Sequence, residues 1–375
     1  MNKGSIYIHI PFCKSKCTYC SFNSVAELKD IDVYVDKLIS EIKNTDTDLE
    51  INTIYLGGGT PSILDENQIR KIFDAISKFK ISTNSEITIE VNPESVNEDK
   101  LKLYQSLGIN RISVGIQSLD DDELKTMNRL HNSNDAIEKI KLISKYFDNI
   151  ACDLILGLKK NVQILDWIKF LSNYVKSFSI YLLSFDEKAK LNPKATYIVQ
   201  NEDDCIDIYD DVVRQLKRLG YERYEVSNFA KKDFKSKHNA NYWERGTYFG
   251  FGAGAHSYIA EKELRIENSS DINQYLNDKG KTDKKLSKID ITEERIMLGL
   301  RTNVGINIKD VSDFVRKKYV GYYYINGENF ILNDEGLKIM NMICVDVIDE
   351  FSEVKFHWYE VFNLLLFTQW RKQWL

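Results

Sequence analysis

The chain has 375 residues, of which 43% are hydrophobic and 29% charged, and its formal net charge is -5. This composition excludes wholesale disorder and a polytopic membrane protein, and it offers no basic footprint for nucleic acid. The N-terminal residues lack the apolar core of a secretory signal, so we expect a cytoplasmic protein. Six cysteines are too few for a disulfide scaffold in a chain of this length, and three of them cluster near the N-terminus.

Short β-rich segments alternate with helical segments through the first half of the chain. The predicted strands cover residues 5–10, 53–58, 86–91, 111–116, 151–156 and 178–183. The predicted helices between them include residues 33–42, 69–79, 98–107 and 135–147. Parallel strands joined by right-handed helical crossovers predict an α/β fold, a barrel or partial barrel of the (β/α)6 kind. Functional side chains should then lie at the C-terminal ends of the strands.

The alternation fades after about residue 185. A helix over 203–219 and a strand-like segment over 221–230 are predicted, followed by a Gly- and aromatic-rich stretch over 242–258. Residues 260–290 are rich in Lys, Asp, Asn and Ser, a composition that predicts surface turns and a domain boundary.

A second, smaller unit is predicted to begin near Ile291. Two helices, a hairpin around Asn326-Gly327 and a further helix would form a small winged-helix-like α+β domain. Winged helices often bind DNA, but this acidic chain has no basic stripe there, so we interpret the unit as a structural cap. The expected domains are 1–260, 261–350 and an aromatic tail of unknown role, 351–375.

Cys13, Cys17 and Cys20 directly follow the first predicted strand, with the spacing Cys-x3-Cys-x2-Cys. Three thiolates on one loop can ligate three irons of a [4Fe-4S] cubane and leave the fourth iron open. Zinc is the alternative, because three close cysteines and a distant histidine could form a Cys3His site. Zinc ligands usually come as two separated cysteine pairs, so the spacing favours the cluster.

A glycine-rich segment, Gly57-Gly58-Gly59-Thr60-Pro61, ends the second predicted strand. Glycines let the backbone approach a ligand closely and adopt positive φ, so this loop could receive a polar group such as an amino acid moiety. The alternative is a tight turn, with Pro61 near the first helical turn and Ser62 or Asp65 as the cap. Its position beside the cysteine loop favours a functional interpretation.

Polar side chains recur at later strand ends, where Glu90, Asn92, Gln117 and Asp153 are found. Each alone could be a satisfied residue that lines a barrel. Together they would present amides and carboxylates to one mouth, which is what binding a ribose, an ammonium and an adenine requires. Arg129 could add a carboxylate clamp, or be a solvated side chain near a helix.

These motifs together resemble the oxygen-independent coproporphyrinogen III oxidase family of radical S-adenosylmethionine (SAM) proteins, and most closely its HemW-type haem-chaperone branch. The resemblance covers roughly residues 5–350. It rests on YIHIPFCKSKCTYCSF, YLGGGTPSIL, IEVNPES, GINRISVGIQS, MNRLH, DLILGL, YEVSNFA, HNANYW and GFGAGAHS.

The resemblance implies a radical SAM barrel in which Cys13, Cys17 and Cys20 hold a [4Fe-4S] cluster. SAM would chelate the open iron, and an electron from a donor such as flavodoxin or ferredoxin would cleave it to methionine and a 5′-deoxyadenosyl radical. The implied cofactor-binding residues are Tyr7, Tyr19, Gly58, Gly59, Thr60, Glu90, Gln117, Arg129 and Asp153.

Two details bear on the branch. The oxidases carry a further cysteine two residues after the third ligand, where this sequence has Phe22. The HNxxYW motif, present as His238, Asn239, Tyr242 and Trp243, is typical of the HemW-type branch and is implicated in haem binding. An imidazole is a sound axial ligand for haem iron, although His238 and Trp243 could instead only pack over the barrel mouth.

The resemblance thus implies a haem chaperone that delivers haem to an acceptor protein, which the sequence does not name. The alternative is a coproporphyrinogen III oxidase with the same SAM-binding residues, so whether the chain is an enzyme stays open.

Residues 351–375 run beyond the resemblance and are unusually aromatic. Their apolar run is too short to span a bilayer, but it ends in Trp, Arg and Lys, so one hypothesis is an interfacial helix with peripheral membrane contact. The other is a helix packed on the second domain or on a partner.

Overall fold

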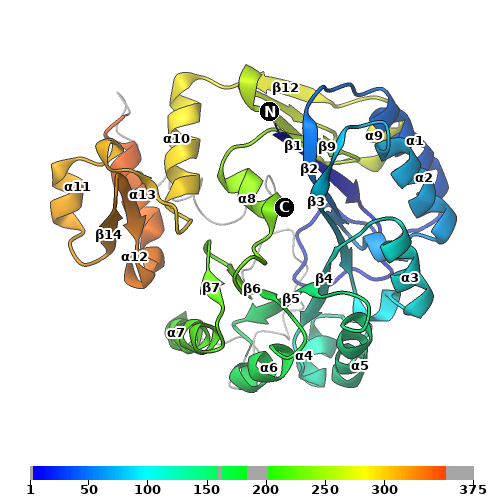
Figure 1. The fold of residues 1–375 in the computed structure, drawn as a ribbon, viewed down its shortest axis with the longest axis horizontal. Coiled ribbons are helices and arrows are strands. Elements are labelled where there is room, and N and C mark those ends of the chain that lie inside the picture. The colour runs from blue at the N-terminus through cyan, green and yellow to red at the C-terminus, as the bar shows by residue number, and fades with distance from the viewer. Residues whose placement is uncertain (1–2, 159–162, 184–201, 352–375) are drawn as a thin grey trace.

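A large, curved sheet forms the centre of the computed structural model, which describes residues 3–158, 163–183 and 202–351 (Figure 1). Six of its strands lie side by side in chain order, and each is parallel to the next. They are β1 (Lys3–Ile10), β2 (Glu50–Gly58), β3 (Ile81–Val91), β4 (Arg111–Gln117), β5 (Asn149–Leu156) and β6 (Ser177–Leu182). All six predicted strands are confirmed.

Helices connect these strands and cover the outer, convex face of the sheet (Figure 1). Their starts are encoded locally: Asp65 and Asn132 each form a capping box at the N-terminus of the helix that follows. The helices are α1 (Ile31–Lys43), α2 (Glu66–Ile76), α3 (Glu98–Ser106), α4 (Asp121–Thr126), α5 (Ser133–Ile143), α6 (Ile164–Leu171) and α7 (Glu202–Arg218). Short 3-10 turns, Pro61–Ile63 and Pro93–Ser95, precede α2 and α3.

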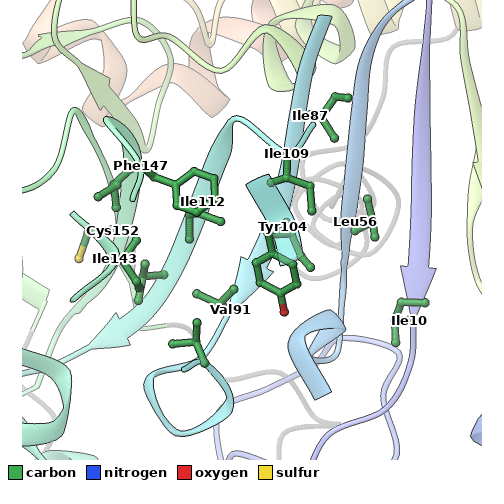
Figure 2. Close-up of a cluster of buried hydrophobic side chains, with 14 of the residues drawn as sticks. Ile10, Leu56, Ile87, Val91, Tyr104, Ile109, Ile112, Ile143, Phe147 and Cys152 are labelled. Carbon is green, nitrogen blue, oxygen red and sulfur yellow. The ribbon is translucent and has the colours of Figure 1, made fainter. Parts of the chain in front are cut away.

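The two faces of the parallel strands differ sharply in chemistry because successive side chains point to opposite sides. Apolar residues of every strand point outward into one large core, in which Leu56, Ile112 and Cys152 lie near Tyr104 of α3 and the side chains of α5 (Figure 2). The alternate positions carry Ser, Thr, Tyr, Asp, Glu and Arg and point inward. The sheet therefore encloses a polar interior.

The six strands form an open barrel because β1 pairs with β9 (Tyr248–Phe251) rather than with β6. Strands β10 (His256–Ile259), β11 (Leu264–Glu267) and β12 (Thr282–Lys285) continue the sheet from β9, each antiparallel to its neighbour. At the other edge, β8 (Asn228–Ala230) and β7 (Glu222–Arg223) follow β6 in antiparallel pairs. The partial (β/α)6 barrel is confirmed.

The prediction of surface turns over 260–290 is wrong. Strands β11 and β12 lie there and extend the large sheet, and α9 (Ile272–Leu276) lies between them. All four side chains of β12 are exposed, and an exposed edge strand is polar, so composition alone does not separate it from a turn. The division into domains 1–260 and 261–350 stays a prediction.

A small three-stranded antiparallel sheet and its helices follow the large sheet (Figure 1). The elements are α10 (Lys288–Gly299), β13 (Ile306–Asn307), α11 (Asp313–Lys318), β14 (Tyr323–Asn326), β15 (Asn329–Leu332), α12 (Asp334–Lys338) and α13 (Met340–Ile348). The predicted hairpin at Asn326-Gly327 is confirmed, and this unit has a hydrophobic cluster of its own around Ile296 and Ile343. The order of elements is that of the predicted winged-helix-like α+β unit.

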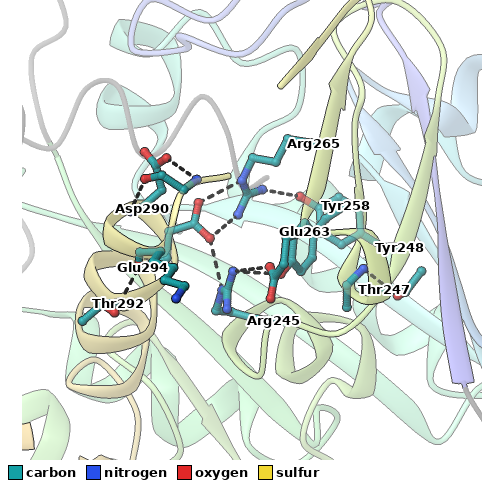
Figure 3. A network of polar contacts seen from close by, with 12 residues as sticks. Arg245, Thr247, Tyr248, Tyr258, Glu263, Arg265, Asp290, Thr292 and Glu294 are labelled. Atoms are coloured by element: carbon teal, nitrogen blue, oxygen red, sulfur yellow. Dashed lines mark hydrogen bonds and ion pairs between the residues drawn. The ribbon is translucent and has the colours of Figure 1, made fainter. Parts of the chain in front are cut away.

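A partly buried ion-pair network joins α10 to the large sheet (Figure 3). Glu294 of α10 accepts from Arg265 of β11 at 2.7 and 2.9 Å, and from Nε of Arg245 at 3.1 Å. Arg245 also pairs with Glu263 at 3.0 Å. Arg245 follows α8 (Lys237–Trp243) by two residues, so the network connects α10 to α8.

Among the described helices, none is long and apolar enough to cross a membrane. The hypotheses about the aromatic tail concern residues that, apart from Phe351, lie outside the described ranges.

Candidate functional site

One pocket extends from the C-terminal ends of the parallel strands into the barrel interior, with an empty volume of about 1730 Å³, part of it open to solvent. It brings together every predicted metal- and cofactor-binding residue except Trp243. These are Cys13, Cys17, Cys20, Tyr7, Tyr19, Gly58, Gly59, Thr60, Glu90, Gln117, Arg129, Asp153, His238 and Tyr242.

The cysteine loop is held in place at its base and on its side. At the base, the Cys13 N–H donates to the Val25 carbonyl at 2.9 Å, and the Val25 N–H donates to the Pro11 carbonyl at 2.7 Å. On its side, the Thr18 N–H donates to the Met127 carbonyl, in the segment after α4, at 3.2 Å. The loop is thus fixed between β1 and α4, with three free thiols on the pocket wall.

The three thiols line one wall of the pocket. Among the described residues, no three His, Cys, Asp or Glu groups converge closely enough to hold one metal ion. A cubane has a different requirement, since each thiolate binds a separate iron. Burial raises the pKa of Cys13 and of Cys20, so the apo loop holds these two as neutral thiols, and ligation would deprotonate them.

The glycine loop supports the cysteine loop directly. The Gly59 N–H donates to the Ile10 carbonyl and the Thr60 N–H to the Phe12 carbonyl, both at 2.8 Å. A Cβ on Gly59 would lie 2.6 Å from the Phe12 carbonyl oxygen and 3.0 Å from Cys13 Sγ, so only glycine fits. Pro61 does begin a 3-10 turn, so this segment serves as a turn and as a pocket wall.

Two buried acids face the pocket. Glu90 accepts from the Tyr55 hydroxyl at 2.8 Å and from the Gly58 N–H at 3.1 Å. Burial nevertheless raises the pKa of Glu90 to about 7. Burial likewise raises the pKa of Asp153 to about 6, against the opposing effect of a hydrogen bond from Ser179. Both acids could bind a cationic or hydroxyl-bearing ligand group, which would lower these pKa values again.

Arg129 is half-buried and positioned, rather than solvated. Its Nη2 donates to Asn92 Oδ1 at 2.7 Å and to the Gly115 carbonyl at 2.6 Å, and its Nη1 lies 3.6 Å from Cys17 Sγ. Gln117, the last residue of β4, adopts a φ of 71°, a strained value for a residue other than glycine.

The helix α8 lies inside the curve of the sheet and forms the deep wall of the pocket (Figure 1). His238 uses both ring nitrogens, Nδ1 with the Thr53 hydroxyl at 2.7 Å and Nε2 with the Tyr242 hydroxyl at 2.9 Å. Burial lowers the pKa of His238 to about 3, so its imidazole is neutral near pH 7. To ligate iron through Nε2, it would have to release Tyr242. Trp243 is half-buried and does not line the described pocket.

Several residues of the pocket interior belong to none of the motifs recognised in the sequence, namely Tyr55, Arg111, Ser113 and Ser179. They occupy the inward positions of β2, β4 and β6, between the apolar outward residues. The signal was present in the alternation itself, because a charged residue within a buried strand must face a polar interior.

The fold and the cysteine-lined pocket are those of a radical SAM protein. Residues 7–171 match the Radical SAM superfamily. The fold resembles that of the coproporphyrinogen III oxidase HemN from Escherichia coli, with a TM-score of 0.78 and 19% sequence identity over 94% of this chain and 91% of that one.

Sequence relatives define the family more closely. The chain is 34% identical to the heme chaperone HemW of Bacillus subtilis over 81% of its own length and 85% of that protein. It is 33% identical to HemW of Escherichia coli over 70% and 72%, and 30% identical to a bovine mitochondrial radical S-adenosyl methionine domain-containing protein 1 over 81% and 74%. The chain belongs to the HemW family, within the oxygen-independent coproporphyrinogen III oxidase family of radical SAM proteins.

Proposed function

We propose that this protein is a cytoplasmic haem chaperone that binds a [4Fe-4S] cluster, SAM and haem, and that it delivers haem to an acceptor protein. The observation that carries the proposal is the convergence of the cysteine loop, the strand-end polar residues and α8 on one pocket. In this proposal Cys13, Cys17 and Cys20 hold the cluster, which supplies an open iron and an electron from a donor of the flavodoxin or ferredoxin class.

The residues around the cysteine loop would bind and orient SAM. Glu90 and Asp153 offer carboxylates for hydroxyl and ammonium groups, and Arg129 offers a cation for a carboxylate. The backbone of Gly58 to Thr60 can approach the ligand closely because two of these residues lack a Cβ. Tyr7, Tyr19 and Gln117 complete this set.

Haem would bind against the wall that α8 forms, where His238 stacks on Tyr55 with ring centroids 5.0 Å apart. At the mouth, Phe22 lines the pocket and is 37% exposed, where the oxidases carry a cysteine. An apolar side chain at this position suits binding of a porphyrin face better than it suits redox chemistry, and so it favours the chaperone over the oxidase.

Haemin titration of the anaerobically reconstituted protein tests this function. A Soret band that saturates at one haemin per chain, with no turnover of coproporphyrinogen III in the presence of SAM and reductant, is the expected result. Turnover without haemin binding would contradict the chaperone and support the oxidase.

Two variants test the haem ligand. If His238 ligates iron through Nε2, His238→Ala should abolish the ligand-shifted Soret band. Tyr242→Phe should preserve or strengthen haemin binding, because it frees Nε2 from its 2.9 Å hydrogen bond. If both variants weaken haemin binding equally and leave the Soret position unchanged, then His238 only packs the pocket wall.

A further inference from the structure

The inner end of the pocket, farthest from the cysteine loop, holds a buried cation that has no hydrogen-bond partner among the residues that the structure describes. Arg111 is the first residue of β4, in register with Thr88 of β3 and Asn149 of β5. It lines the pocket and only 3% of its surface is exposed. We call this end, where Arg111 and His238 line the pocket, the floor, and the end at the cysteine loop the mouth.

No hydrogen bond satisfies the guanidinium within the described part of the chain. Its Nε is buried without a partner, and its Nη groups have no hydrogen-bond or ion-pair partner there either. A buried charge is costly unless it is paired, and a protein that retains one usually pairs it with a ligand or an opposite charge.

The acids of the interior do not satisfy Arg111 by direct contact. Glu86 is committed to the N-terminus of α8, where its carboxylate accepts from the N–H groups of Lys237 and His238, both at 3.1 Å. Asp153, four residues further along the register of β4, is held by Ser113 and Ser179. Glu86 and Asp153 interact with the charge of Arg111 electrostatically, without a hydrogen bond, so the N–H donors of Arg111 remain available to a ligand in the pocket.

From this geometry we infer that Arg111 binds a carboxylate of the ligand that occupies the pocket. The planar guanidinium fork matches a carboxylate with two parallel hydrogen bonds. The adjoining wall is aromatic, with Tyr7 and Tyr55 stacked at 6.2 Å and Tyr55 and His238 at 5.0 Å. A flat, apolar ligand with pendant carboxylates fits both features. This inference rests on the proposed function, in which the ligand is haem and the carboxylate is a propionate.

Titrations of the reconstituted full chain with haemin and with haemin dimethyl ester, which lacks free propionates, test the role of Arg111. Charge-assisted hydrogen bonds predict that wild type binds haemin roughly 10- to 100-fold more tightly than the ester. Arg111→Gln should lose this preference and bind the ester as wild type does. Arg111→Lys, which keeps the charge but not the fork, should retain part of the preference.

Ser177→Ala is the matched control, because Ser177 begins β6, does not line the described pocket and has a buried hydroxyl that no described residue hydrogen-bonds. It should retain the full preference for haemin. Unchanged cluster absorption near 400 nm and an unchanged thermal midpoint would show that each variant folds.

Two results would overturn the inference. They are equal binding of haemin and ester by wild type, and an equal loss of affinity for both ligands in Arg111→Gln, which would indicate a structural role. Failure of wild type to bind either ligand is a different result, because it would contradict the proposed function itself.

Discussion

The mouth and the floor of this pocket each present a buried or half-buried arginine whose Nε has no partner among the described residues, but the two arginines differ in the contacts of their Nη groups. At the mouth, Arg129 donates to Asn92 and to the Gly115 carbonyl and lies beside Cys17. At the floor, Arg111 has no bonded partner among the described residues. The mouth is therefore preorganised by contacts within the chain, whereas the floor leaves the Nη donors of Arg111 available to a ligand.

The cause of this difference lies in the elements that build each end. The mouth consists of loops that follow strands, and loops can hydrogen-bond one another closely, as the cysteine and glycine loops do. The floor consists of side chains from strand interiors and from α8, whose spacing the sheet sets. Rigid spacing keeps polar groups apart, so a donor there can stay open.

Removing a cluster ligand at the mouth should have the strongest consequence. Cys17→Ala should abolish the cluster absorption near 400 nm after anaerobic reconstitution, because two thiolates and solvent do not hold a cubane. Cys152→Ala is the control, since Cys152 is fully buried in the outer core. Cluster content should be measured as iron and sulfide per chain. A Cys17→Ala protein with full iron content would contradict the assignment of this cysteine.

A smaller effect should follow from removing the ion pairs that connect α10 to the segment after α8, the helix that carries His238 of the floor. Glu294→Ala leaves Arg245 and Arg265 without their shared carboxylate in a partly buried site, so we expect a loss of about 3 kcal/mol in the free energy of unfolding. Urea unfolding measures it. Glu293→Ala, on the same helix and without an ion pair among the described residues, should change stability by less than about 1 kcal/mol. Equal losses would mean that the network does not stabilise the contact.

Glu90 lines the pocket, and the pH dependence of the free energy of unfolding tests whether its carboxyl is protonated in the folded protein. Because burial raises the pKa of Glu90 from 4.5 to about 7, the folded apo protein holds its proton more tightly than the unfolded chain does. The contribution of the protonated Glu90 carboxyl to the free energy of unfolding is therefore fully present below pH 4.5, and it is lost as the pH rises through about 7.

Glu90→Gln stays neutral, so above pH 7 the variant should be more stable than wild type by roughly 1–3 kcal/mol, and near pH 4.5 the two should converge. Urea unfolding of ligand-free protein at pH 5 and pH 8 measures this difference. Glu138→Gln, an exposed substitution on α5, provides the control. A constant difference between Glu90→Gln and wild type at both pH values would show that Glu90 is not protonated in the folded apo state.

Much of the fold followed from local patterns. Alternation with period two marked all six parallel strands, and helical periodicity marked the helices α1, α2, α3, α5 and α7 between and after them. The edge strand β12 and its neighbour β11 escaped prediction because the side chains of β12 are all exposed and those of β11 are at most half-buried, so neither strand has a buried face that requires apolar residues.

Part of the candidate site could also be predicted from local sequence patterns. Cys13, Cys17 and Cys20 lie within eight consecutive residues, and a short loop keeps such residues close together in any fold. The convergence of Gly59, Glu90 and Arg129 on those cysteines could be expected once parallel strands were predicted, since the ends of such strands meet at one edge.

By itself, the sequence determined the parallel barrel, the cysteine loop and the glycine turn, because each depends on residues close together along the chain. The folded chain was needed to see that His238 uses both ring nitrogens, that Glu294 joins two distant arginines, and that Arg111 has no hydrogen-bond partner within the described ranges. The physical reason is that hydrogen bonding and burial depend on distances between elements, which a linear pattern does not contain.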